Sequence, residues 1–231
     1  MAAEERNGEF RVADRRPARN DAGMEGLIAS WYARQTAHDI DEFKRTAHRI
    51  AAYISAGARV LEVAPGPGYL AIEIVKLTGC RLVGLDLSRT FVRMAGKNAR
   101  RAGVRIDFEL GDAADLPFPA ESFDFIVCRA AFKNFARPLK ALDEMHRVLK
   151  AGGMALIIDL RQDFSPQALN DHVSGSGRGA ISAAITKLIF NTMLKRRAYT
   201  RDSLAELVAQ SQFKGGDIRL DPIGFELWLR K

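Results

Sequence analysis

Residues 60–69, Val-Leu-Glu-Val-Ala-Pro-Gly-Pro-Gly-Tyr, constrain the fold most strongly, because a short apolar run leads directly into a glycine-rich turn. An apolar run that ends in such a turn predicts a buried strand followed by a helix. Gly66, Gly68 and Ala71 match the spacing of a dinucleotide-binding turn, and Asp86 follows near the expected acidic position. The segment therefore predicts an α/β fold with a nucleotide-cofactor pocket at the turn.

The residues within the turn bear on which cofactor it binds. A diphosphate is held by converging backbone N–H donors, and Pro65 and Pro67 each lack that donor. Glu62, just before the turn, would repel a diphosphate but attract the ammonium and sulfonium groups of S-adenosylmethionine. The turn therefore favours S-adenosylmethionine. An NAD-dependent oxidoreductase, or a turn that binds nothing, remains as an alternative interpretation.

Strand and helix patterns alternate through the chain. Strands are expected at 59–63, 81–86, 105–109, 123–128, 154–159, 217–220 and 225–230, and helices at 69–77, 89–102 and 138–150. The alternation predicts a parallel sheet with right-handed crossovers, and the turn at 222–224 predicts an antiparallel hairpin at the end. The expected fold is a Rossmann-like, doubly wound α/β sheet of seven strands, mostly parallel with an antiparallel C-terminal strand.

Polar residues follow the carboxyl ends of several expected strands, where ligands bind in such sheets. Asp86 could accept both hydrogen bonds of a ribose diol, and Leu87 could cover one face of an adenine. Asp112 suits the exocyclic amine of that base, while the N–H of Ala113 could donate to a ring nitrogen. A single Asp in a loop is often a turn or cap residue, but Glu62, Asp86 and Asp112 at successive strand ends favour the ligand interpretation.

The domain organisation follows from composition. Residues 1–22 are charged and poor in large apolar residues, which predicts a flexible leader. The 47% hydrophobic content supports one domain over 23–231. We divide it into covering helices at 23–55, a cofactor-binding core at 56–161, a lid insertion at 162–200, and a C-terminal helix and β-hairpin at 201–231.

Several residues are candidates for contact with a substrate. Trp31 and Tyr32 lie on the first covering helix, where they either touch the ligand or anchor the helix on the sheet. Phe132 could line an aromatic or aliphatic acceptor pocket. The helical lid contains His172, the weak candidate for a general base, and no other catalytic residue is assigned. The basic end of the lid suggests either contact with a membrane or packing over the sheet, and packing is the commoner fate of such a helix.

Composition also limits the partners. A net charge of +7 permits nucleic acid or an anionic membrane, but the basic residues lie outside the cofactor motifs, which favours a solvated basic face. Cys80 and Cys128 lack metal-ligand spacing, so we expect buried thiols and no metal. The chain has no run of eighteen apolar residues and no signal-peptide pattern, so we expect a cytoplasmic protein without a transmembrane segment.

Over residues 56–161, the chain resembles the class I S-adenosylmethionine-dependent methyltransferases, in particular the small-molecule, methyltransferase type 11-like branch with the quinone-type C-methyltransferases. The resemblance depends on an ordered set of motifs: Val-Leu-Glu-Val-Ala-Pro-Gly-Pro-Gly, Gly-Leu-Asp-Leu-Ser, Gly-Asp-Ala-Ala-Asp-Leu-Pro-Phe, Phe-Asp-Phe-Ile-Val-Cys and Arg-Val-Leu-Lys-Ala-Gly-Gly. It implies methyl transfer to a small, apolar or aromatic metabolite, with S-adenosylhomocysteine as product. The acceptor atom, the oligomeric state and a non-catalytic or repurposed cofactor-binding role stay open.

The resemblance also implies roles for individual residues. Those that correspond to family positions are Glu62 at the start of the glycine turn, the turn glycines Gly66 and Gly68, the ribose-side Asp86, the adenine-side Asp112, and Arg129 after the fourth strand.

The chain departs from the family pattern at two places. Ala64 stands where the family usually has glycine, and residues 129–134 lack the histidines that are common in quinone-type relatives. The Asn/Asp-Pro-Pro-aromatic motif of amino-methylating nucleic-acid enzymes is missing, which disfavours a nucleic-acid substrate.

Overall fold

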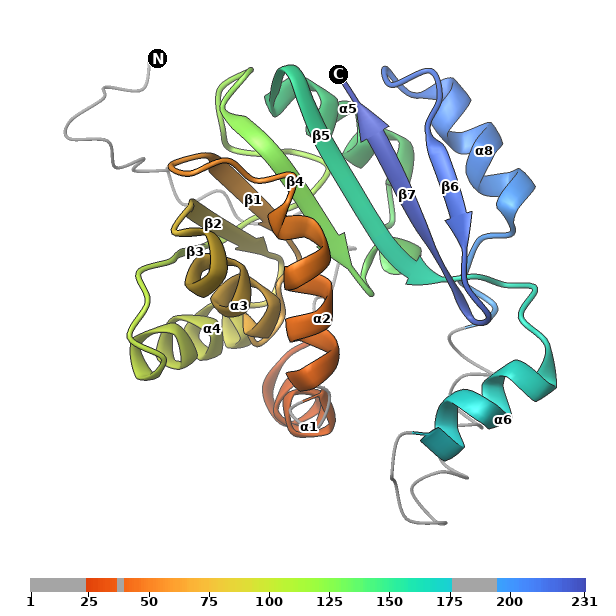
Figure 1. Cartoon of the computed structure of the whole chain (residues 1–231), viewed down its shortest axis with the longest axis horizontal. Helices are drawn as coiled ribbons and strands as arrows, with labels where there is room; N and C mark the ends of the chain where they lie inside the picture. The colour runs from red at the N-terminus through yellow and green to blue at the C-terminus, as the bar shows by residue number, and fades with distance from the viewer. Residues whose placement is uncertain (1–23, 37–39, 176–194) are drawn as a thin grey trace.

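A computed structural model describes residues 24–36, 40–175 and 195–231. At its centre is a seven-stranded sheet with the order β3-β2-β1-β4-β5-β7-β6 (Figure 1). The strands are β1 (Arg59–Val63), β2 (Arg81–Asp86), β3 (Asp107–Leu110), β4 (Phe123–Arg129), β5 (Leu149–Leu160), β6 (Asp217–Leu220) and β7 (Gly224–Arg230). The expected leader at 1–22 and the apolar part of the expected lid lie outside the described residues.

The pairing of the strands confirms the predicted fold class. The strands β3, β2, β1, β4 and β5 are parallel, and β7 is antiparallel to both β5 and β6. The order in which strands are added to the sheet reverses at β1, because β2 and β3 lie on one side of it and β4 and β5 on the other. Such a reversal opens a crevice at the carboxyl ends of the strands, and that edge is therefore the place to look for a site.

Helices cover both faces of the sheet. They are α1 (Gly26–Thr36), α2 (Ile40–Ala51), α3 (Tyr69–Thr78), α4 (Arg89–Arg101), α5 (Pro138–Val148), α6 (Pro166–Gly175) and α8 (Arg201–Gln210), with a short 3₁₀ helix η2 (Phe132–Asn134). One buried cluster joins α2 and α3 to the sheet, and a second joins α5 and α8 to it. The two clusters give the three layers of a doubly wound α/β fold, in which a parallel sheet is covered on both sides.

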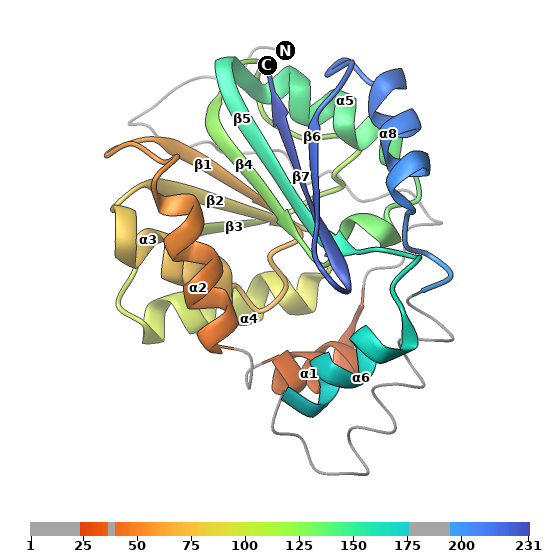
Figure 2. The same cartoon turned by 45° about the vertical axis from the view of Figure 1, so that its right-hand side comes forward.

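The helix α2 packs on one face of the sheet, whereas α1 lies on the side of the carboxyl ends of the parallel strands (Figures 1 and 2). Phe43, Ala47 and Ile50 form the buried face of α2. Just before α1, the carboxylate of Glu25 accepts a hydrogen bond from the backbone N–H of Arg89 at 2.8 Å, at the start of α4. Both α1 and α6 lie on the side to which the parallel strands point (Figures 1 and 2).

The junction of α5 and β5 differs from the sequence prediction. The helix expected over 138–150 ends at Val148, and Gly152 and Gly153 lie inside β5 instead of terminating the helix. Gly152 has a φ of +77°, which glycine adopts readily, and its N–H donates to the carbonyl of Lys231 at 3.0 Å. The pairing register of β4 and β5 shifts at this point. Contact with the distant C-terminal residue therefore decides the local structure.

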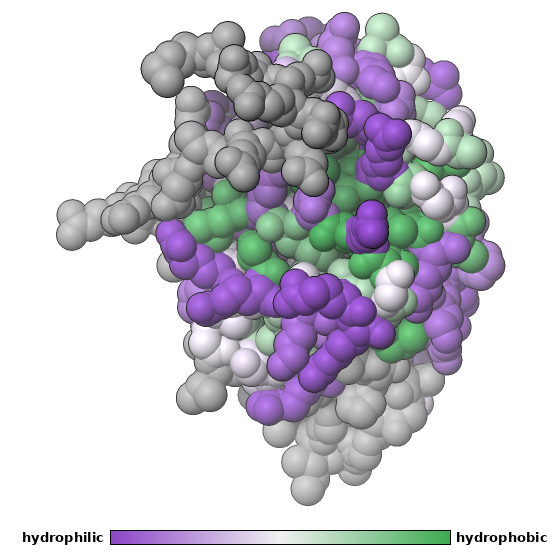
Figure 3. Space-filling view, turned by 90° about the vertical axis from the view of Figure 1, so that its left-hand side faces the viewer, coloured by the Kyte–Doolittle hydropathy of each residue, from purple (hydrophilic) through white to green (hydrophobic). Residues whose placement is uncertain are grey.

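The described surface is mixed in polarity. Seen from the side of β3 and α4, hydrophilic residues border a band of hydrophobic ones (Figure 3). Arg93, Lys97, Arg100 and Arg101 are exposed on α4 and form a solvated basic face. Among the described residues, no helix is long and apolar enough to cross a membrane.

Candidate functional site

The glycine turn joins β1 to α3 and uses up its own backbone donors. The N–H of Ala64 donates to Leu85 O at 2.8 Å, and that of Gly68 donates to Pro65 O at 3.0 Å. The N–H of Gly66 donates to Asp86 Oδ2 at 3.0 Å. The other two residues of the turn are prolines, so every N–H between positions 64 and 68 is already bonded within the protein. The turn therefore lacks the free donors that a diphosphate needs.

The two turn glycines serve different purposes. Gly68 has a φ of +80°, and a Cβ there would lie 2.9 Å from the Cβ of Ala95 and 3.0 Å from the ring of Phe108. A side chain at this position would force α3 away from α4. Gly66 has a φ of +55°, and a Cβ there would meet nothing within 4 Å. Gly66 therefore leaves open space at the turn, whereas Gly68 permits close packing.

Ala64 adopts the left-handed conformation with a φ of +56°. This conformation is unfavourable for a residue with a Cβ. We expect Ala64→Gly to raise the free energy of unfolding by about 0.5 to 1 kcal/mol, since relief of strain outweighs the entropy that glycine adds to the unfolded chain. Urea denaturation measures the change.

The matched control is Ala120→Gly. Ala120 is exposed and lies outside the left-handed region, so glycine there should lower the free energy of unfolding. A loss of stability in both variants would contradict the strain at Ala64.

Glu62 is buried at the end of β1, with 2% of its surface exposed. Its carboxyl group accepts a hydrogen bond from the backbone of Ala71, while Oε2 has no partner in the described part of the chain. Desolvation raises the pKa of Glu62 to about 8, and the positive charge of Arg129 opposes that rise. A buried oxygen without a partner is costly, so this position favours an added donor or cation.

Asp86 ties the end of β2 to the glycine turn. It is 7% exposed, and its Oδ1 accepts from the N–H of Ser88 at 2.8 Å while Oδ2 accepts from Gly66. Desolvation raises the pKa of Asp86 to about 6, although these backbone hydrogen bonds oppose the rise. The structure therefore brings Glu62 and Asp86 to the two sides of one turn.

The predicted adenine side is arranged around Asp112. Its Oδ1 accepts from the N–H of Ala114 at 2.8 Å, and its Oδ2 is paired with Arg137. The carboxylate thus stabilises its own turn, which is the alternative that the sequence left open for an isolated Asp. Ala113, which follows β3, and Leu87, which follows β2, are both half-buried.

Arg129 links the end of β4 to the covering helix α2. Its guanidinium carbon lies 4.5 Å from the centre of the Phe43 ring, and Nη2 is 3.8 Å from Glu42 Oε1. The side chain is 21% exposed and its charge acts on the buried Glu62. Arg129 therefore contacts α2 and acts on Glu62, one of the two acidic residues at the carboxyl ends of β1 and β2, Glu62 and Asp86, which we call the rim.

The substrate candidates are placed differently from one another. Phe132 is fully buried in the core, with its ring 5.4 Å from that of Phe135 and 5.6 Å from that of Tyr199, and its contact with a substrate stays a prediction. Tyr32 is half-buried and packs edge-on against Phe91, whereas Trp31 is 45% exposed on α1.

The remaining expectations concern a base and a metal. His172 falls within α6, but its side chain lies outside the described residues. Within the described residues, no three His, Cys, Asp or Glu side chains gather as metal ligands. Cys80 and Cys128 are buried free thiols, as predicted.

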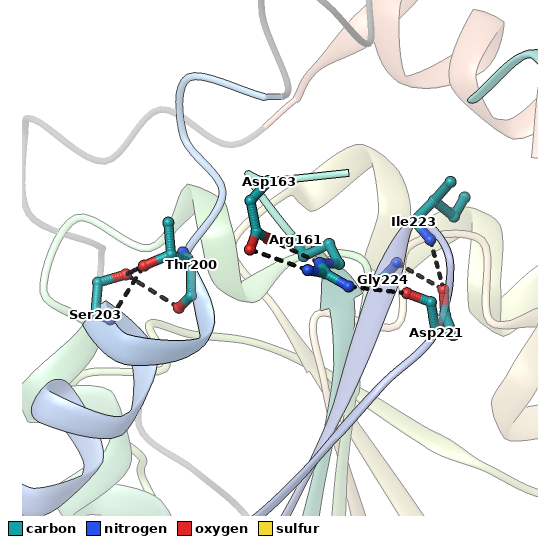
Figure 4. A network of polar contacts seen from close by, with 7 residues as sticks. All are labelled: Arg161, Asp163, Thr200, Ser203, Asp221, Ile223 and Gly224. Carbon is teal, nitrogen blue, oxygen red and sulfur yellow. Dashed lines mark hydrogen bonds and ion pairs between the residues drawn. The ribbon is translucent and has the colours of Figure 1, made fainter. Parts of the chain in front are cut away.

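A polar network beyond β5 was missed by the sequence analysis. Arg161 pairs with both carboxylate oxygens of Asp163, at 2.7 and 2.9 Å, and reaches the carbonyl of Asp221 at 3.5 Å (Figure 4). Nearby, Thr200 and Ser203 form the N-terminal cap of α8. The network joins segments that are far apart in sequence, so only the fold reveals it.

A cavity lies between α6 and the turn that joins β6 to β7. It has a volume of about 440 Å³, and Ser165, Ala168, Asp171, Asp221 and Ile223 are among the residues that line it. It is separate from the glycine turn, and its lining is partly acidic.

A second missed feature is an ion pair between Lys133 and Asp159. Lys133 Nζ lies 2.7 Å from Asp159 Oδ1, and their side chains are 4% and 0% exposed. Lys133 follows β4 and Asp159 lies within β5, and only the adjacency of these two strands brings the residues together.

Comparisons with known proteins identify the family. Residues 61–157 match the family model described as a methyltransferase domain. Demethylmenaquinone methyltransferase of Deinococcus radiodurans is 33% identical over 158 residues, which cover 68% of this chain and 60% of that protein. The 2-phytyl-1,4-naphtoquinone methyltransferase of Synechococcus elongatus is 36% identical over 114 residues, which cover 48% of this chain and 49% of that protein. The chain thus spans about half the length of the curated relatives it matches.

A solved structure shows the same fold. The putative S-adenosyl-L-methionine-dependent methyltransferase of Methanococcus maripaludis covers 93% of this chain and 97% of its own, with a TM-score of 0.69 and 19% identity. This likeness and the strand order show a Rossmann-like fold. The chain belongs to the class I S-adenosylmethionine-dependent methyltransferases, through the methyltransferase domain at 61–157. These matches do not support the nicotinamide alternative.

Proposed function

We propose that this chain transfers a methyl group from S-adenosylmethionine to an apolar, aromatic acceptor of the quinone type. One observation carries the proposal: the backbone donors of the glycine turn are all used, while the buried Glu62 keeps an unpaired carboxyl oxygen. A diphosphate finds no donors there, whereas the cationic groups of S-adenosylmethionine find a buried carboxyl group whose ionised form their charge favours.

We assign the cofactor contacts as follows. Glu62 receives the ammonium of the methionine moiety, and the nearby charge of Arg129 attracts its carboxylate. Asp86 accepts from the ribose hydroxyls with the lone pairs that its two backbone partners leave free. Around these groups, the backbone and small side chains of further residues shape the pocket: Ala64, Gly66, Gly68, Leu87, Asp112 and Ala113.

The chemistry requires alignment more than acid–base catalysis. S-adenosylmethionine, when bound, supplies a methyl carbon that is activated towards nucleophiles by its sulfonium. The protein has to hold the acceptor in line and exclude water, and α1, on the side of the sheet to which the parallel strands point, can contribute to both (Figures 1 and 2). A general base is not required for this step, and His172 stays a candidate.

The acceptor class rests on the relatives and on the covering layer. The two curated relatives are named for a naphthoquinone and for demethylmenaquinone. In this chain Trp31 is 45% exposed on α1, and α1 lies on the side of the sheet to which the parallel strands point (Figure 2). An aromatic acceptor could stack on such a ring. Because residues 129–134 lack histidines, we carry over no base from the relatives.

A transfer assay tests the proposal. Purified protein is incubated with S-adenosylmethionine labelled in the methyl group and with a reduced, prenylated naphthoquinone that lacks the ring methyl group. We expect label in the organic extract with this acceptor, and background label with the matched acceptor that already carries the methyl group. Label in neither extract, from protein that binds S-adenosylhomocysteine, would contradict the acceptor class.

A further inference from the structure

The carboxylate of Asp159 is the centre of a buried set of hydrogen bonds. Its Oδ2 accepts from the backbone N–H of Lys133 at 2.9 Å, and its Oδ1 accepts from Lys133 Nζ at 2.7 Å and from the N–H of Leu160 at 2.8 Å. Lys133 Nζ also donates to the carbonyl of Ala130 at 2.8 Å. One charge pair therefore holds both ends of the turn 130–133.

This turn begins directly after Arg129. Ala130 has a φ of +60°, which is unfavourable for a residue with a Cβ, and its N–H donates to Ile158 O at 2.7 Å. Strained backbone persists only where surrounding contacts enforce it. The bonds from β5 and from Lys133 are those contacts, and they fix the direction in which the chain leaves β4.

Stability alone does not account for the pair. Burial removes both charges from water, and the attraction between them often fails to compensate for that cost relative to an apolar pair of similar volume. An apolar pair could fill the same space between β4 and β5. It could not bond the carbonyl of Ala130 and the N–H of Lys133 at the same time, so what the ion pair adds is the shape of the turn.

We propose that Lys133 and Asp159 are positioning residues that hold Arg129 in place against the cofactor. Arg129 lies over the ring of Phe43 and near Glu42, and a released turn would let its guanidinium follow these α2 partners away from the rim. The inference depends on the proposed cofactor site, to which Arg129 belongs.

A thermodynamic cycle tests the proposal with S-adenosylhomocysteine as the probe. Its affinity is measured by calorimetry for the wild type, Arg129→Ala, Lys133→Met/Asp159→Leu, and the triple variant. We expect Arg129→Ala to weaken binding about tenfold in the wild-type background, the scale of one charge-assisted contact, and less than about twofold in the apolar-pair background. A pair with a purely structural role would leave the two factors equal.

The outcomes separate the proposal from its premises. Equal factors in both backgrounds, or no effect of Arg129→Ala in the wild type, would overturn it. If the apolar pair fails to fold, Lys133→Gln/Asp159→Asn replaces it in the cycle, because the shorter amide loses the contact with Ala130. If Arg129→Ala then weakens binding by less than about threefold in this background, the proposal is supported. If it weakens binding as much as in the wild type, the proposal is overturned. Absence of binding by the wild type would instead reject the proposed function.

Discussion

Replacing Glu62 with glutamine is expected to make the protein more stable at alkaline pH than the wild type. Burial raises the pKa of Glu62 to about 8 in the folded state, against 4.5 for an unperturbed carboxyl group. The folded state therefore binds the proton more tightly, and the free energy of unfolding falls as the pH rises from about 4.5 through 8. Glutamine does not titrate, so it removes this loss.

The expected gain is measurable. At pH 9 the free energy of unfolding should exceed that of the wild type by about 2 to 4 kcal/mol, which allows for the burial of a neutral amide. Urea denaturation at pH 6 and pH 9 gives the values for both proteins. The control is Glu206→Gln on the exposed face of α8, which should leave the pH dependence unchanged. If Glu62→Gln loses stability between pH 6 and 9 as the wild type does, Glu62 is not the group responsible.

The second large effect is expected for Asp86→Ala. Asp86 both holds the N–H groups of Gly66 and Ser88 and, by our proposal, accepts from the ribose hydroxyls. Its loss should weaken the binding of S-adenosylhomocysteine by about 3 kcal/mol, or roughly a hundredfold. Calorimetry measures this, with Asp107→Ala on the exposed part of β3 as the matched control. An affinity within about twofold of the wild type would remove Asp86 from the site.

A pH profile adds a test of the same residue. Because desolvation raises the pKa of Asp86 to about 6, the carboxylate becomes protonated as the pH falls through 6. We therefore expect the affinity of the wild type to decline below pH 6. Asp86→Asn, which cannot titrate, should bind weakly at every pH and lose this part of the decline.

Much of the fold could be predicted because the deciding signals are local. The apolar runs and the glycine turn give β1 and β2 with the observed bounds, and the expected C-terminal helix is found as α8. The boundary of α5 and β5 could not be found in this way. Gly152 bonds to Lys231 across the sheet, and this contact makes a helix stop signal part of a strand.

The site could be predicted where it depends on strand ends and not where it depends on neighbouring strands. Glu62 and Asp86 follow from their positions after apolar runs. The pair of Lys133 and Asp159 depends on the adjacency of β4 and β5, which no local pattern states. The burial of Phe132 could not be predicted for the same reason, since an aromatic residue after a strand can face the core as readily as a pocket.

The central claim is that this acidic rim binds S-adenosylmethionine and that the glycine turn has no free N–H donors to bind a diphosphate. Calorimetric titration of the wild type with S-adenosylhomocysteine and, separately, with NADH tests it most directly. We predict saturable binding of S-adenosylhomocysteine and no detectable heat from NADH. Binding of NADH by a protein that ignores S-adenosylhomocysteine would contradict the account.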